Sequence, residues 1–299
     1  MYDLIIVGGG PAGITAGIYA ARKKLNTLII SKNFIGQTGM AGTIENWPGE
    51  KNILGPELIF KFINHLDNYQ IDKKEEEVVS IFKNEKFEIR TKNNLFTASA
   101  VIIATGRKPR ELGVINEKEF IGKGVVYCTT CDAPLFKNKK VVVAGGGNAA
   151  FEAAIEMISY TDEVFLFDIS PKFSADEILQ EKAKEKRVGL FKNIRINEAE
   201  GKNFLEKIKY TDLVKNEENT INADGLFIQI GSLPITGFLN DFLKLDSDKN
   251  IIINFETQEA SEEGVFAAGD VTNIKDKQII IAAGEGAKAA LSAYRFLKK

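Results

Sequence analysis

The segment DLIIVGGGPAG (residues 3–13) sets the architecture of the first part of the chain. Its apolar half predicts a short buried strand, and Gly8, Gly10 and Gly13 form a G-x-G-x-x-G turn. A stretch of small residues follows, and then a second expected strand over residues 27–30. The order strand, glycine turn, helix, strand is typical of a dinucleotide-binding unit.

The same pattern returns in the middle of the chain, as VVVAGGGNAA (residues 141–150), an expected helix over about 148–159 and a strand over 164–167. The second strand ends 23 residues after the first glycine in both copies, at Ser31 and at Asp168. Two copies in one register predict two nucleotide-binding domains of similar plan.

Each glycine of such a turn has a physical task. The first permits a tight turn, the second lets the backbone approach a pyrophosphate, and the third lets helix and strand pack closely. In the second copy Gly145 and Gly147 are kept, and Ala150 replaces the third glycine. With Asp168 they form a candidate second nucleotide site, although a turn kept for packing alone stays open as the alternative.

Composition excludes several classes of function. The 299 residues include 39 basic and 41 acidic side chains, so a net charge of −2 offers no field to gather nucleic acid. No apolar run approaches the ~20 residues of a membrane-spanning helix, and we expect a cytoplasmic protein without a membrane partner. Two cysteines and the single histidine, His65, predict neither a disulfide scaffold nor a metal site.

The pair Cys128 and Cys131 is followed directly by Asp132. Cysteines two residues apart can form a disulfide that exchanges with a dithiol substrate. Zinc would need four ligands, and the chain has no second cysteine pair; an inert pair of buried thiols is the other alternative. Exchange also needs a proton for the leaving thiolate, and Asp132 is the available acid if burial raises its pKa.

Near the carboxyl end, GVFAAGD (residues 264–270) predicts a short strand that ends in Gly269 and Asp270. Open α/β sheets bind ligands at the carboxyl ends of their strands, so this carboxylate is a further candidate. A turn capped by Asp270 is the plain alternative.

Taken together, these motifs resemble the low-molecular-weight thioredoxin reductases over essentially the whole chain. The motifs that carry the resemblance stand in the family's order and approximate spacing: Gly8 to Gly13, Gly36-Gln37, Glu45 to Gly49, Ala104-Thr105-Gly106, Cys128 to Asp132, Gly145 to Ala150 and Gly264 to Asp270. The resemblance implies an α/β fold of two Rossmann-like three-layer domains, the second inserted into the first. We expect a discontinuous FAD domain over residues 1–113 and 240–299, a central domain over 114–239, and a homodimer.

The resemblance also implies roles for single residues. Cys131 would face the flavin, Cys128 would attack the substrate disulfide, and Asp132 would supply the proton. The expected FAD-binding residues are Gly8, Gly10, Pro11, Ala12, Gly13, Ser31, Gly36, Gln37, Asn46, Ala104, Thr105, Gly106, Gly269, Asp270, Gln278 and Ile279.

One departure from the family concerns the electron donor. Members that use NADPH carry His-Arg-Arg-x-x-x-Arg after the second strand of the central domain, where this chain reads DISPKFS (residues 168–174). A carboxylate repels the 2′-phosphate and Lys172 cannot replace bidentate arginines, so NADPH is disfavoured. NADH is possible, since Asp168 could accept from a ribose hydroxyl. A domain that has lost its nucleotide is the other interpretation, and it resembles the ferredoxin-dependent flavin thioredoxin reductases.

From these features we expect a flavin-dependent thioredoxin reductase that passes electrons through FAD and the Cys128/Cys131 pair to a thioredoxin-like protein. Ferredoxin is the favoured donor because of the charge argument at Asp168, and a flavin suits it since it can collect single electrons and deliver a pair. The alternatives are an NADH-dependent enzyme, an NADPH-dependent one, and, from another class, a flavoprotein sensor or binding module without turnover. The cysteine pair argues against a ferredoxin-NADP reductase of this fold.

Overall fold

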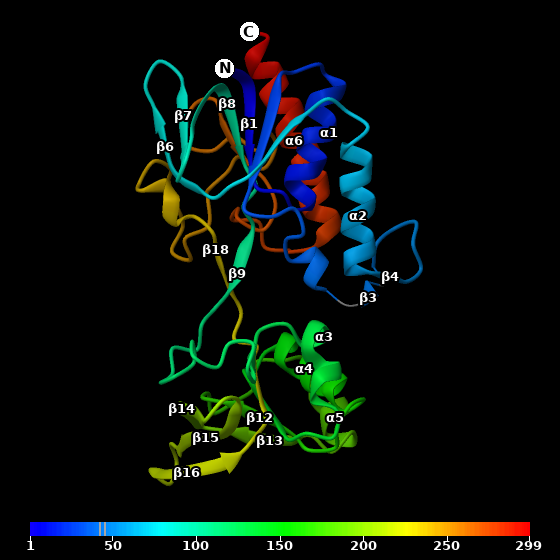
Figure 1. The fold of residues 1–299 in the computed structure, drawn as a ribbon, viewed down its shortest axis with the longest axis vertical. Helices are drawn as coiled ribbons and strands as arrows, with labels where there is room; N and C mark the ends of the chain where they lie inside the picture. The colour runs from blue at the N-terminus through cyan, green and yellow to red at the C-terminus, as the bar shows by residue number, and fades with distance from the viewer. Residues whose placement is uncertain (42, 45) are drawn as a thin grey trace. The chain divides into compact units, whose positions relative to one another are not determined.

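The computed structural model describes residues 1–41, 43–44 and 46–299, and of Thr43, Thr130 and Cys131 it describes the backbone alone. The chain divides into two compact units. Unit 1 consists of Met1–Lys108 and Leu233–Lys299, and unit 2 of Pro109–Ser232. The sequence-based boundaries were placed a few residues later, after residues 113 and 239. Two short paired strands, β9 (Arg107–Pro109) and β18 (Ser232–Pro234), lie where the chain passes between the units (Figure 1).

Unit 1 is built on one sheet whose main strand order is β5-β2-β1-β8-β7-β6, with β19 also paired to β8. The strands on either side of β1 run parallel to it, and β6 and β7 add an antiparallel edge. The strand bounds are β1 (Tyr2–Val7), β2 (Thr27–Ser31), β5 (Asp72–Glu75), β6 (Val78–Lys83), β7 (Phe87–Thr91), β8 (Leu95–Ile103) and β19 (Val265–Ala267).

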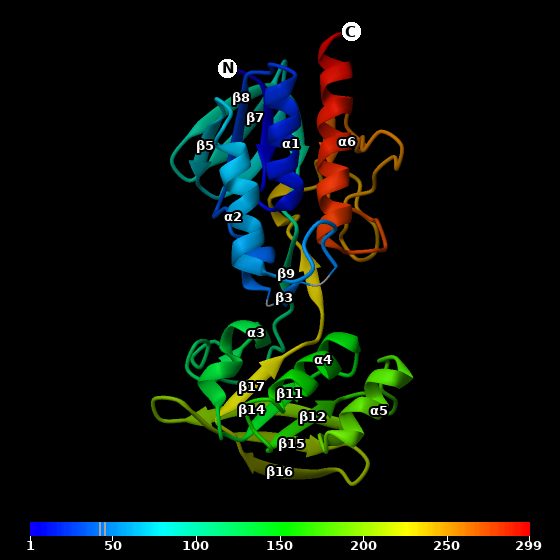
Figure 2. The ribbon, with the colours of Figure 1, turned by 90° about the vertical axis from the view of Figure 1, so that its right-hand side faces the viewer.

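Three long helices cover one face of this sheet, and the first and last of the chain lie side by side (Figures 1 and 2). They are α1 (Pro11–Arg22), α2 (Gly55–Leu66) and α6 (Ile279–Leu297). Alternate residues of β1 serve the two faces of the sheet: Leu4 and Ile6 pack under the helices, while Ile5 and Val7 pack on the opposite core. An unbroken apolar run is therefore what a parallel strand buried on both faces requires.

Unit 2 contains a five-stranded parallel sheet of order β10-β17-β11-β12-β13 and an antiparallel sheet β14-β15-β16 (Figure 2). The strand bounds are β10 (Val125–Val126), β11 (Val141–Ala144), β12 (Val164–Asp168), β13 (Gly189–Lys192), β14 (Ile194–Gly201), β15 (Leu205–Asp212), β16 (Glu217–Asn222) and β17 (Gly225–Ile228). Its helices are α3 (Thr129–Asp132), α4 (Asn148–Met157) and α5 (Glu177–Glu185). The predicted α/β class with two Rossmann-like units is confirmed.

The remaining elements are short: β3 (Thr43–Ile44), β4 (Ile53–Leu54), η1 (Thr38–Met40), η2 (Ala133–Phe136) and η3 (Gly237–Leu239). The helix expected over about 148–159 ends at Met157, and the last helix begins at Ile279 rather than near Ala282. His65 lies on the exposed side of α2. In the part of the chain that the structure describes, no helix is long and apolar enough to cross a membrane, and no group of His, Cys, Asp or Glu is arranged to hold a metal.

Candidate functional site

Two glycines of the first glycine turn of unit 1, Gly8 and Gly13, leave no space for a side chain. Gly8 has φ +120°, and a Cβ there would lie 2.1 Å from the carbonyl oxygen of Ala104. A Cβ at Gly13 would lie 1.9 Å from the carbonyl oxygen of Gly8. Both contacts are far inside van der Waals distance, so α1 reaches the end of β1 only because these two positions are glycine. The same contact brings Ala104 and Thr105 to the turn.

The amino-terminal end of α1 opens onto free space. Gly10 is its N-cap residue, Pro11 opens the helix, and no described atom lies within 4 Å of the position that a Gly10 Cβ would take. No side chain caps the helix and its first turn carries no acidic residue. The first backbone N–H groups of α1, which a helix leaves without intrahelical partners, and the positive helix dipole therefore face a space that suits a pyrophosphate.

Other residues predicted for the cofactor surround this turn. A Cβ at Gly36, whose φ is +54°, would lie 3.6 Å from the Cα of Gly10, and one at Gly9 would lie 2.9 Å from Ser31. The Gln37 amide donates to the carbonyl oxygen of Arg107, next to Gly106. By contrast, the Thr105 hydroxyl donates to the carbonyl oxygen of Ile235 over 2.8 Å, so it serves the fold itself.

Residues from the two ends of unit 1 meet beside α1. A Cβ at Gly269, whose φ is +78°, would lie 3.0 Å from the Cβ of Ala12, and one at Gly286 would lie 2.0 Å from the Ala12 carbonyl oxygen. The Asn46 amide donates to Gln278, which caps α6 ahead of Ile279, over 3.1 Å. Glu45, part of the same motif, lies outside the described residues.

Asp270 directly follows Gly269, and burial raises its pKa, although Lys277 and Arg107 act in the opposite direction. Lys277 is itself partly buried, which lowers the pKa of its ammonium group. The Arg107 guanidinium donates to the side chain of Asn250 over 2.6 Å and to the Asp270 carbonyl oxygen over 3.5 Å. The Asp270 carboxylate thus lies in an enclosed, polar and charged corner.

Sequence reasoning missed Glu285, which is 5 % exposed on α6. Its Oε2 accepts a 2.6 Å hydrogen bond from the Gly269 amide, and its Oε1 has no partner among the described atoms. Burial raises the pKa of this carboxyl. A single acid among the alanines and glycines of α6 was the signal that could have found it.

These observations fit a bound FAD. The clashes at Gly8 and Gly13, the open space at Gly10 and the uncapped helix suit a pyrophosphate, and an unpartnered buried oxygen stands nearby on Glu285. The structure brings the predicted residues of both chain ends together at the carboxyl ends of β1, β8 and β19, where open parallel sheets bind ligands.

The second glycine turn, in unit 2, repeats this geometry. Gly145 has φ +137°, and a Cβ there would lie 2.3 Å from the Gln229 carbonyl oxygen and 3.1 Å from the Ala150 Cβ. Gly147 is the N-cap of α4, which no side chain caps. A Cβ at Gly146 would lie 2.0 Å from the Asp168 carboxylate, so this acid reaches directly against the turn.

A cavity of about 570 Å³ opens beside Gly145 and Asp168. Asp168 is buried, and no described residue donates a hydrogen bond to its carboxylate. Sequence reasoning missed Arg110 and Arg195, which line the same cavity. They come from a loop and from β14, so their spacing from Asp168 along the chain carried no signal.

The redox segment also belongs to unit 2. Cys128 follows β10 and Tyr127 and is disulfide-bonded, and the one other cysteine of the sequence is Cys131, whose side chain lies outside the described residues. Asp132 ends α3, and its amide donates to the Cys128 carbonyl oxygen over 3.3 Å. Burial raises the pKa of the Asp132 carboxyl, which is the condition that a proton donor at neutral pH must meet.

Comparisons with known proteins find relatives that have the same fold over nearly the whole chain. The sequence profile described as pyridine nucleotide-disulphide oxidoreductase matches residues 2–290. Thioredoxin reductase from T. acidophilum is 40 % identical, with a TM-score of 0.87 and 98 % of each chain covered. Lactococcus lactis thioredoxin reductase is 32 % identical, with a TM-score of 0.90, covering all of this chain and 99 % of that one.

Among curated sequences, a component of the alkyl hydroperoxide reductase of Staphylococcus aureus is 40 % identical over 99 % of this chain. The match covers 59 % of that relative, so this chain spans about three fifths of its length. The matched profile covers nearly every residue, including both glycine turns and the disulfide segment, and the chain belongs to the pyridine nucleotide-disulphide oxidoreductase family.

Proposed function

We propose that this chain is a flavin-dependent reductase of protein disulfides, with FAD in unit 1 and Cys128 and Cys131 as the dithiol that meets a thioredoxin-like substrate. The observation that carries the proposal is the disulfide at Cys128 beside Asp132, whose pKa burial raises. Disulfide exchange needs a proton for the leaving thiolate, so an acid beside the disulfide favours exchange chemistry over a module that only binds.

The chain's own residues would divide the work as follows. The turn at Gly8 to Gly13 and the Gly269–Asp270 corner would hold FAD, which supplies an electron pair when bound and reduced. Cys128, as the thiolate, would attack the substrate disulfide, forming a mixed disulfide that Cys131 resolves. Asp132 would give its proton to the departing thiolate, a role that the pKa raised by burial favours.

For the electron donor we propose NADH. The lack of an arginine string after β12 argues against NADPH, and on the sequence alone it favours ferredoxin. The cavity beside Gly145 favours NADH instead, since the Asp168 carboxylate is buried, accepts from no described residue and suits the two hydroxyls of an unphosphorylated ribose. Arg110 and Arg195 in the same cavity offer charge to the anionic part of a nucleotide.

The test is anaerobic stopped-flow bleaching of the bound flavin by NADH, NADPH and reduced ferredoxin in parallel, followed by turnover with thioredoxin. We expect NADH at micromolar concentration to bleach the flavin within one turnover time. Bleaching by ferredoxin alone would restore the donor favoured on the sequence and make the second glycine turn a structural relic. Bleaching without reduction of any protein disulfide would contradict the proposed reductase.

The same experiment also tests which protein accepts the electrons from the Cys128/Cys131 dithiol. The Staphylococcus aureus relatives are named for alkyl hydroperoxide reduction, which makes a hydroperoxide-reducing partner protein the alternative to thioredoxin. Both acceptors present a protein disulfide, so they share the chemistry at Cys128. Comparing kcat/KM for the two acceptors with the same NADH-reduced enzyme separates them.

A further inference from the structure

Unit 2 contains a buried acid with four hydrogen bonds that the proposed chemistry does not use. Glu117 is 2 % exposed. Its carboxylate accepts from the amides of Leu112 (2.9 Å), Gly113 (2.5 Å) and Val114 (3.2 Å), and from the hydroxyl of Tyr127. A buried carboxylate is stable only when its oxygens are well partnered, and here one side chain gathers donors from two separate segments.

The first segment belongs to the nucleotide cavity. Leu112, Gly113 and Val114 line that cavity. Immediately beyond them, Ile115 pairs with β14: its amide donates to Asn197 and its carbonyl oxygen accepts from Ala199, both over 3.0 Å.

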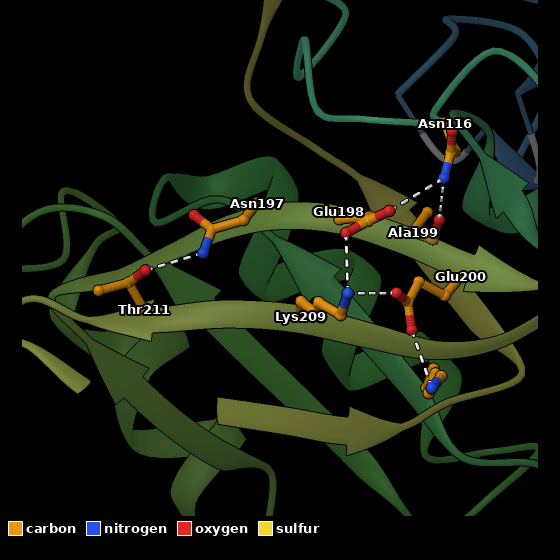
Figure 3. A network of polar contacts seen from close by, with 8 residues as sticks. Asn116, Asn197, Glu198, Ala199, Glu200, Lys209 and Thr211 are labelled. Carbon is orange, nitrogen blue, oxygen red and sulfur yellow. Dashed lines mark hydrogen bonds and ion pairs between the residues drawn. The ribbon is translucent and has the colours of Figure 1, made fainter. Parts of the chain in front are cut away.

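Asn116 continues this attachment, as Figure 3 shows. Its amide donates over 3.2 Å to the Glu198 carboxylate and over 3.2 Å to the Ala199 carbonyl oxygen. Lys209 of β15 pairs in turn with Glu198 and Glu200. The loop that carries the cavity wall is therefore fixed to β14 on one side and to Glu117 on the other.

The second segment leads into the disulfide. Tyr127 stands between β10 and Cys128. Burial, then the hydrogen bond to Glu117, raises the pKa of its phenol, so the hydroxyl remains a donor throughout the working pH range. The Gln229 amide donates to the Tyr127 carbonyl oxygen over 3.0 Å, and the Gln229 carbonyl oxygen lies against Gly145 of the second glycine turn. Tyr127 thus bonds Glu117 and Gln229, which in turn contact residues that line the cavity.

We propose that Glu117 and Tyr127 are positioning residues that couple the nucleotide cavity of unit 2 to the disulfide at Cys128. The inference rests on the proposed function, because it gives the cavity a nucleotide and the disulfide a redox cycle. Ligand in the cavity presses on the Leu112–Val114 wall, and a change of redox state moves the backbone next to Tyr127. Both displacements act on the hydrogen bonds of one carboxylate.

The direction of the coupling follows from the state that the structure holds. All four hydrogen bonds to Glu117 are formed while Cys128 is disulfide-bonded. A nucleotide that fits the cavity in this arrangement stabilises the disulfide form over the dithiol form. By thermodynamic linkage, the disulfide form then binds the nucleotide more tightly by the same factor.

The probe is ADP-ribose, which carries the adenosine and phosphates of the nucleotide but accepts no hydride. The holoenzyme is equilibrated anaerobically with mixtures of reduced and oxidised dithiothreitol, with and without saturating ADP-ribose, and thiols are alkylated and counted by intact mass. Each protein disulfide takes two electrons and two protons from one dithiothreitol, which closes to its cyclic disulfide. We expect binding at least about 5-fold tighter to the disulfide form, seen as a midpoint about 20 mV more negative with ADP-ribose.

Two variants test the named residues. Tyr127→Phe removes one hydroxyl and Glu117→Gln one charge. Each should reduce the preference of ADP-ribose for the disulfide form over the dithiol form to below about 2-fold. Tyr160→Phe and Glu185→Gln are matched controls in the same unit, outside these hydrogen bonds, and should keep the full factor. Circular dichroism and FAD content establish that each variant is folded.

Equal affinity of the disulfide and dithiol forms for ADP-ribose in the unmodified enzyme overturns the proposal. A folded Tyr127→Phe variant that keeps the full difference in affinity overturns it as well. Failure of both ADP-ribose and its 2′-phosphate to bind also overturns it. In that case reduction of a protein disulfide driven by ferredoxin would leave the reductase proposal standing. Conversely, coupling without any protein-disulfide reduction would support the role of Glu117 and contradict the proposed function.

Discussion

Asp132 directly follows Cys131 in the sequence, and its pKa depends on the surrounding fold. Burial raises the pKa of its carboxyl, so the group keeps its proton to higher pH than a free aspartate. Because attack needs the Cys128 thiolate, the exchange rate should rise as that thiol deprotonates, and the part supplied by Asp132 should fall as pH rises through its raised pKa. Asp132→Asn should slow thiol exchange by about 10² or more and remove that part of the pH profile. The measurement is mixed-disulfide resolution between pH 5 and 9, and an unchanged profile would assign the proton to water.

The two cysteines make a sharper prediction. Cys128→Ser and Cys131→Ser should each abolish thioredoxin reduction, because both sulfurs are needed to form and resolve the mixed disulfide. FAD should remain bound at full occupancy, since its expected site lies in unit 1. Turnover and the flavin absorption spectrum are measured on the same samples. Retained turnover in either variant would contradict the proposed relay.

Asp168 decides between the two nucleotides. Asp168→Ala should raise the KM for NADH by about 10-fold or more, the loss of one charged hydrogen bond, while kcat changes little. The same substitution should lower the KM for NADPH, because the repulsion ends and Arg110 and Arg195 remain in the cavity. Steady-state kinetics with NADH and with NADPH give the two KM values and their ratio in each enzyme. Equal effects on NADH and NADPH would contradict ribose recognition by this carboxylate.

At the scale of elements, the first glycine turn separates packing from cofactor binding. Gly13→Ala would place a methyl group 1.9 Å from the Gly8 carbonyl oxygen, so α1 must move from β1. We expect the apoprotein to lose about 1–3 kcal/mol of stability. Gly10→Ala meets no described atom within 4 Å and needs no unusual φ, so apoprotein stability should hold while FAD affinity falls. Denaturant titration and FAD binding distinguish the pair, and equal destabilisation of both apoproteins would refute the assignment.

At the scale of the whole molecule, each ligand should protect its own unit. FAD stabilises what it binds by RT ln(1 + [L]/Kd), about 2.7 kcal/mol at 100 Kd. Hydrogen exchange should therefore slow in β1, α1 and α6 when FAD is added to the apoprotein, while β11 and β12 change little. ADP-ribose should do the reverse. Equal protection of both units by FAD would contradict two separate sites.

We also propose that the chain forms a homodimer, as its resemblance to thioredoxin reductases implies. Sedimentation velocity should show a species of twice the 33.0 kDa chain mass at micromolar concentration. A monomer at that concentration would contradict it.

Local stretches of sequence were enough to predict the two nucleotide-binding units and the disulfide segment. A buried parallel strand, a glycine turn and the following helix each depend on residues within about 25 positions of one another. The apolar run at residues 4–7 and the close packing at Gly13 follow from the same short stretch. The pair of cysteines followed by Asp132 needs only neighbours in the chain.

Which distant residues share a site depends instead on the packing of whole elements. Glu285 reaches Gly269 because α6 packs on α1 at backbone contact, and no spacing in the sequence encodes that approach. Arg195 enters the nucleotide cavity from β14, and Glu117 joins the cavity wall to Tyr127. The raised pKa of Asp132 is likewise a matter of burial, which the surrounding fold creates. Contacts and burial are set when elements pack together, whereas turns and buried strands follow from the residues next to them.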